Sequence, residues 1–159
     1  MKIKHTISLL LIALSVACSC GASSANAIKG HSYAAETLDE FAQEARDTVM
    51  EMRKVDIVQA VTKAEAAGQD PRPAAELAAA QFDARPLIPA VNSFISAKEV
   101  YVRSVLLAAQ ADKPDFAAAR LILRDALNSY RSLKEALGDR GDRLPDIPPI
   151  VFDLVGGGR

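Results

Sequence analysis

The sequence predicts an all-α protein, an up-down-up-down antiparallel four-helix bundle followed by an extended C-terminal tail. Alanine is the commonest residue of the 159, and tryptophan is absent. Alanine loses no side-chain entropy in a helix and adds little to the face of a strand. Apolar residues also recur at steps of three and four, which is the spacing of one helical face. These patterns together favour helices packed side by side.

The first bundle helix is predicted to begin at Thr37 and to end at Gly68. Thr37 and Glu40 match the capping-box pattern, in which each side chain bonds the backbone N–H of the other residue. Gly68 suits the end, because glycine tolerates the left-handed conformation that follows many helices. The apolar face is formed by Leu38, Phe41, Ala45, Val49, Met52 and Val55.

The second helix is predicted to be short, over about residues 74–84. Asp70 is available as its N-cap, and either Pro71 or Pro73 suits the first helical position. A proline break near residues 86–89 ends the helix, because an interior proline loses a hydrogen bond and clashes with the preceding turn at a cost of ~3 kcal/mol.

The third helix is predicted over about residues 89–111, and the fourth begins near Asp112 and Pro114 and ends at Gly138. The third helix is expected to bury Val91, Phe94, Ile95, Val102, Val105, Leu106 and Ala109. The fourth is expected to bury Phe116, Ala119, Leu123, Ala126, Tyr130, Leu133 and Leu137, in strict alternation of three and four. Tight proline-containing turns join the helices in pairs, so that four helices of alternating direction would form one domain over residues 33–138.

Residues 139–159 form the predicted C-terminal tail, in which a charged turn and a proline-rich stretch precede a short apolar run. The run could fold back onto the bundle or bind a partner. Docking is favoured, because a free apolar hexamer is an aggregation hazard. The candidate partner contacts are Ile150, Val151, Phe152, Leu154 and Val155.

Residues 1–27 are typical of an export signal. Lys2 and Lys4 form a positive start, residues 7–16 form an apolar core, and small residues follow. Ten apolar residues are too few to span a bilayer, which needs roughly 20. We therefore expect an extracytoplasmic protein.

Two processing sites compete, and they give different mature chains. Ala25-Asn26-Ala27 is a site for the general signal peptidase, whereas Ser15-Val16-Ala17-Cys18 resembles a bacterial lipobox, with Ser15 where leucine is usual. In the second case residues 1–17 are the signal, Cys18 carries lipid that holds the protein to the membrane, and residues 18–32 form a flexible tether. A retained signal anchor is a third alternative.

The mature chain is poor in the side chains that catalysis and metal binding require. Cys18 and Cys20 are the only cysteines, and His31 is the one histidine after the signal, in the expected tether. One solvated histidine excludes a Ser-His-Asp triad and a multi-histidine zinc site, so we expect neither cofactor nor metal. The net charge of −1 includes Lys2 and Lys4, which leaves −3 on the mature body and argues against nucleic acid.

Two short stretches resemble the periplasmic cytochrome b562 family of exported four-helix bundles. They are Ala35-Glu36-Thr37-Leu38-Asp39 and Ala126-Leu127-Asn128-Ser129-Tyr130-Arg131. The resemblance implies a bundle fold, with a haem-ligating methionine and histidine at the two stretches. Ala35 and Arg131 occupy those two positions here, and neither side chain ligates haem iron.

The expected function is therefore that of a non-catalytic exported helical-bundle protein, an envelope lipoprotein or a periplasmic interaction protein. It would act by presenting a helical surface or its C-terminal segment to another envelope protein. The alternative is a small-ligand or haem-related binding bundle whose ligands come from elsewhere. An enzyme that uses carboxylates alone would need two acidic residues in one pocket, and nothing in the spacing demands this.

Overall fold

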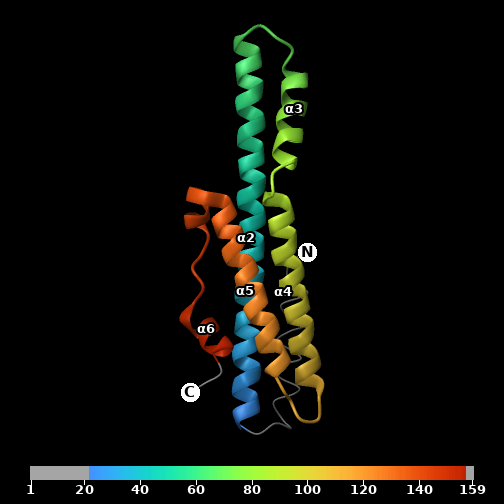
Figure 1. The fold of residues 1–159 in the computed structure, drawn as a ribbon, viewed down its shortest axis with the longest axis vertical. Coiled ribbons are helices and arrows are strands. Elements are labelled where there is room, and N and C mark those ends of the chain that lie inside the picture. Colours follow the sequence, from blue (N-terminus) through green and yellow to red (C-terminus); the bar gives the residue numbers. More distant parts are fainter. Residues whose placement is uncertain (1–21, 157–159) are drawn as a thin grey trace.

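The computed structural model describes residues 22–156, and every regular element in that range is helical (Figure 1). This confirms the predicted all-α class. The elements are α2 (Ala22–Ala66), α3 (Pro71–Asp83), α4 (Leu87–Gln110), α5 (Ala117–Leu137), the 3₁₀ helix η1 (Gly138–Arg143) and α6 (Pro149–Val155). In this range no helix is both long enough and apolar enough to cross a membrane.

Helix α2 has 45 residues and runs the length of the molecule, which corresponds to about 67 Å at 1.5 Å per residue (Figure 1). Helices α3 and α4 lie one after the other along α2 and run antiparallel to it, and α5 returns beside α4. The predicted up-down-up-down order is therefore wrong, because α3 and α4 run in the same direction. Three helices, α2, α4 and α5, surround the main core, and α3 extends beyond them with the end of α2.

The projecting part, residues 50–66 of α2 together with α3, is called the arm. Beyond Val49, Ala64 is the one buried residue of α2, whereas Phe82 of α3 is completely buried. Two ion pairs join the helices near the base of the arm. Arg53 pairs with Asp83 at 2.8 Å, and Arg85 of the α3–α4 joint pairs with Asp56 at 2.7 Å.

The proline break lies where it was predicted, but it does not turn the chain around. Pro86 is the N-cap residue of α4, and Pro89 lies in the first turn. The N–H groups of a first turn have no acceptor within the helix, so a proline there removes no hydrogen bond. The chain can therefore leave α3 and enter α4 while it continues along the same face of α2.

The start of α2 differs most from the prediction. Thr37 lies inside the helix, and its hydroxyl donates to the carbonyl oxygen of Tyr33 at 2.9 Å, so the capping box with Glu40 is not formed. Residues 22–32, expected as part of a flexible tether, are the first turns of α2. The sites at Lys2, Lys4, residues 7–16 and Cys18 lie outside the described residues.

The main core confirms most of the predicted apolar faces. All seven positions of the α5 face are buried, as are Leu38, Phe41, Ala45 and Val49 of α2. At its centre the Tyr130 ring stacks on Phe41 at 4.7 Å and lies tilted against Phe94 at 5.1 Å. Tyr101 of α4 is completely buried, although its position was not predicted to be so.

The helix ends follow local signals. A carboxylate oxygen of Asp70 accepts from the N–H of Arg72 at 3.0 Å, which confirms the predicted cap of α3. Gly68 and Gly138 have φ of +68° and +56°, the left-handed region that favours glycine. Gly138 thus ends α5 and turns the chain back along the bundle.

We expect Gly141→Ala to destabilise the fold by about 1–3 kcal/mol, the usual cost of overpacking. Gly141 is buried in η1, and an added methyl group would collide with the carbonyl oxygen of Lys134, a backbone atom that cannot move aside. Urea unfolding followed by circular dichroism measures the change. Gly156→Ala is the control, because its added carbon would lie 3.7 Å from the nearest atom, an ordinary contact. Equal stability of the two variants would contradict the packing described here.

Candidate functional site

The C-terminal tail is the first candidate site. After Gly138 the chain passes through η1, continues in extended form over residues 144–148 and ends in α6, which contacts α2 and α5 (Figure 1). Residues 139–156 are called the strap. The structure thus confirms that the tail folds back onto the bundle.

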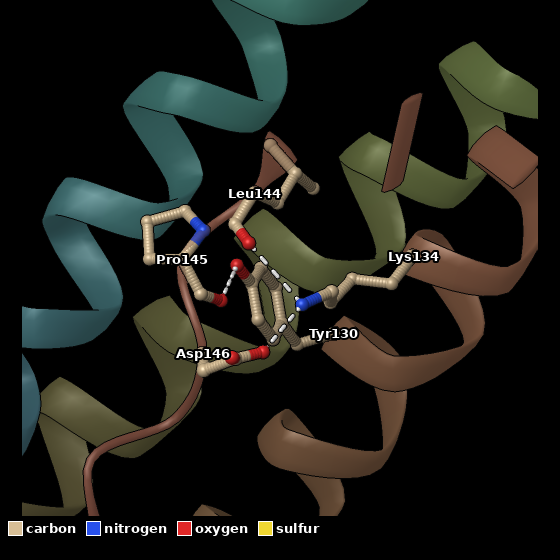
Figure 2. A network of polar contacts seen from close by, with 5 residues as sticks. All are labelled: Tyr130, Lys134, Leu144, Pro145 and Asp146. Atoms are coloured by element: carbon tan, nitrogen blue, oxygen red, sulfur yellow. Dashed lines mark hydrogen bonds and ion pairs between the residues drawn. The ribbon is translucent and has the colours of Figure 1, made fainter. Parts of the chain in front are cut away.

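Two side chains of α5 hold the middle of the strap (Figure 2). The hydroxyl of Tyr130 donates to the carbonyl oxygen of Pro145 at 2.7 Å. The ammonium group of Lys134 donates to the carbonyl oxygen of Leu144 at 3.2 Å and pairs with Asp146 at 2.9 Å. Burial, together with the charges of Glu44 and Asp146, raises the pKa of Tyr130, so its hydroxyl remains a donor at neutral pH.

Apolar side chains of the strap also pack in or against the core, Leu144 and Ile147 from its extended part and three more from α6. Val151 is completely buried in the main core. Leu154 lies against Gly30 of α2, where an added Cβ would be 2.9 Å from its Cδ2 atom. The guanidinium of Arg131 lies over the Phe152 ring at 5.1 Å from its centre, a cation–π contact.

The five residues predicted as partner contacts differ in their burial. Of the five candidate residues, Val151 belongs to the core, and Leu154 and Val155 are half-buried against it. Ile150 and Phe152 are exposed, at 51% and 38% of their surface. The chain therefore uses the inner face of α6 itself and leaves two apolar side chains on the outer face.

Ala35 and Arg131, which stand where the cytochrome b562 family has its haem ligands, lie in different surroundings. Ala35 is buried on the core face of α2, whereas Arg131 is exposed and contacts the strap. Within residues 22–156 no group of three or more His, Cys, Asp or Glu side chains is placed to hold a metal ion. An open groove of about 350 Å³ between α4 and α5 is lined by Ala90, Ser93, Asp125, Asn128, Ser129 and Ser132, none of which is a usual haem ligand.

His31 is the second candidate, and the expectation that it is solvated is wrong. Its side chain is completely buried. The reason is that α2 begins before it, so that His31 falls on the buried face, four residues before Ala35 and seven before Leu38. Extending the spacing of three and four backwards from Leu38 would have found His31 and, one turn earlier, the buried Ile28.

Three helices surround this histidine. Its Nδ1 atom lies 2.8 Å from the hydroxyl of Tyr101 on α4, which is also 3.2 Å from the carbonyl oxygen of His31. The imidazole stacks on Phe116, at the start of α5, with 4.7 Å between the ring centres. Both hydrogen bonds form at once if Nδ1 carries the proton and the tyrosine donates to the carbonyl oxygen. That tautomer leaves Nε2, which has no partner, as an unprotonated nitrogen.

Burial is the main cause that lowers the pKa of His31 to about 4, and the nearby positive charge of Arg120 lowers it further. The histidine is therefore neutral near pH 7. A neutral imidazole enclosed by two aromatic rings can link helices, but a substrate in solution does not reach it.

Comparison of the chain with models of known families, with curated proteins and with solved structures finds no match.

We expect acid to destabilise the fold through His31. A free histidine has a pKa of about 6.5, and the folded chain lowers this to about 4. Between these values the unfolded chain binds a proton that the folded chain does not, so stability falls as the pH falls. The loss from about pH 7 to about pH 4.5 is on the order of 2 kcal/mol.

Urea unfolding of the natural chain and of His31→Gln at both pH values measures this effect. The carboxylates titrate in both proteins, so the difference between the two pH dependences isolates the histidine. Identical pH dependences would show that His31 does not titrate in this range.

We expect Tyr130→Phe to loosen the strap and to cost about 1 kcal/mol, because it removes a donor from the Pro145 carbonyl group and keeps the stacked ring. Tryptic cleavage after the exposed Arg143 should become faster. Asp146→Asn is the matched control, because the Asp146 side chain is 98% exposed and an exposed ion pair contributes little to stability. An equal or larger effect of Asp146→Asn would contradict this ranking.

Proposed function

We propose that this chain is a non-catalytic helical-bundle protein of the cell envelope, which presents the arm to another envelope protein. The export signal at residues 1–27 supports the location. The surface of the arm supports the mode of action.

The observation that carries the proposal is an apolar flank on the α2 side of the arm. Met50 and Val58 are 55% and 52% exposed, and the half-buried Ile57 lies between them on the same side of the helix. With Arg53 and Lys54 they line a hollow of about 230 Å³. Apolar side chains that gather around a hollow at the projecting end of a molecule are typical of an interaction surface.

The buried histidine supports a role without catalysis. His31 and Tyr101 bond each other and join α2 to α4. A general base must reach its substrate within hydrogen-bonding distance, directly or through one water molecule. A completely buried imidazole stacked on Phe116 is better suited to holding helices together.

The length of α2 suggests how an anchored form would be arranged. Cys18 precedes the start of α2 by four positions, which span at most about 14 Å of extended chain. A lipid on Cys18 would therefore hold the bundle close to the membrane, and α2 would carry the far end of the arm about 67 Å from its own first residue. Cleavage after Ala27 would instead keep Ile28 and His31 in a released protein.

A photo-crosslinking amino acid at Val58, introduced in the native host, tests the proposal. We expect an adduct with one envelope protein, and a mature chain that begins at lipid-modified Cys18 or at Ile28, both read by mass spectrometry. Leu121 of α5 is the matched control, because it is 56% exposed and lies outside the arm. The proposal fails if Val58 gives no adduct, if Leu121 gives the same one, or if the chain stays in the cytosol with Met1 in place.

A further inference from the structure

The bundle holds the strap through its main chain and through aliphatic side chains that pack in or against the core, namely Leu144, Ile147, Val151, Leu154 and Val155. Tyr130 and Lys134 donate to the carbonyl oxygens of Pro145 and Leu144 (Figure 2). Every peptide carries such acceptors, so these two contacts recognise an extended backbone and not a particular side chain. Peptide-binding grooves obtain affinity from main-chain hydrogen bonds in the same way and obtain specificity from pockets for a few side chains.

Aliphatic side chains supply the specific contacts, from Leu144 and Ile147 in the extended part and from α6. Val151 is completely buried, and Leu154, one helical turn later, lies on Gly30. Any larger residue at position 30 would crowd Leu154, so the glycine leaves room for this side chain. The surface of α2 and α5 that α6 covers is called the groove. It accepts aliphatic residues three positions apart.

Helix α6 is too short to be stable away from this groove. It has seven residues and no side-chain N-cap, and isolated helices shorter than about 12 residues are unstable in water. It is joined to the bundle on one side by the extended residues 144–148 and is the last described element of the chain. Its helical form thus depends on the groove, whereas α2, α4 and α5 contact one another directly.

We propose that the groove between α2 and α5 is a peptide-binding site, that α6 is its resident occupant, and that a partner protein binds there with a segment of the same chemistry. Such a segment has aliphatic residues in the places of Leu144 and Ile147, two prolines in the places of Pro148 and Pro149, and a short helix with aliphatic residues in the places of Val151 and Leu154. The groove lies at the opposite end of α2 from the apolar flank of the arm. Binding here is thus a second interaction, independent of the one proposed above.

The first experiment opens the groove in the full-length chain. Val151→Asp places a charge where a buried aliphatic side chain lies, and should release α6. Ile150→Asp is the matched control, because the neighbouring side chain is 51% exposed. The probe is a fluorescein-labelled peptide of residues 143–156, and binding is followed by fluorescence anisotropy.

We expect the peptide to bind Val151→Asp at least about tenfold more tightly than the natural chain or Ile150→Asp, because their own α6 occupies the groove at a high effective concentration. Adding Gly30→Leu to Val151→Asp should abolish binding. A second peptide, with alanine everywhere except at the two prolines and at the positions of Leu144, Ile147, Val151 and Leu154, should bind within about tenfold of the first.

Three results would overturn the proposal. One is a Val151→Asp chain that unfolds cooperatively and binds no peptide, and another is equal binding to Val151→Asp and Ile150→Asp. The third is binding restricted to the natural sequence together with dimers in gel filtration, because the occupant would then be the tail of a second copy.

A second variant serves if Val151→Asp does not fold. A protease site inserted between the exposed Asp142 and Arg143 allows the tail to be cut from a chain that folded with the natural sequence. The labelled peptide should then replace the cut tail in the groove. A tail that the peptide cannot replace would overturn the proposal.

Discussion

The structure depends on the continuous buried face of α2. That face begins at Ile28, passes through His31 and Leu38, and continues to Val49, and α4 and α5 are packed against it. Because one helix of 45 residues supplies this face, every other element is arranged along its axis: α4 and α5 beside its first part, α3 beside its last part, and the strap across its start. A domain of this size would ordinarily enclose one compact core, whereas the core of this chain is elongated and follows the axis of α2.

Tyr130 connects the core to the strap. Its ring stacks on Phe41 and lies against Phe94, so the three main helices determine where its hydroxyl is directed. That hydroxyl then bonds the carbonyl oxygen of Pro145, which joins the last part of the chain to the centre of the fold. Because a buried donor without a partner is costly, the core itself favours an extended backbone at this position. The strap supplies the acceptor that the Tyr130 hydroxyl needs, and another extended peptide could supply it equally.

Sequence patterns predicted the helices well and their arrangement less well. The spacing of three and four found every buried position of α5 except Leu127, because that helix is amphipathic along its whole length. The same spacing continues backwards through His31. Thr37 and Glu40 match a helix start, but the helix continues before them because the preceding alanine-rich residues favour helix themselves. Pro86 showed where α3 ends, but a break gives no information about the direction in which the chain continues. That direction depends on α2 being long enough to support two helices in succession, a tertiary property that no local pattern contains.

The two proposed binding surfaces take their separation from α2. Gly30 in the groove and Val58 on the arm lie 28 residues apart on one helix, which corresponds to about 42 Å at 1.5 Å per residue. The ion pairs of Arg53 and Arg85 secure the arm to the joint between α3 and α4, so the arm is supported at its base. Partners bound at the two surfaces would therefore be kept apart by a supported helix. A chain that holds two proteins at a set distance needs no reactive side chain. It needs a long helix supported by its neighbours, and α4 and α5 pack on the buried face of α2 over the first part of its length.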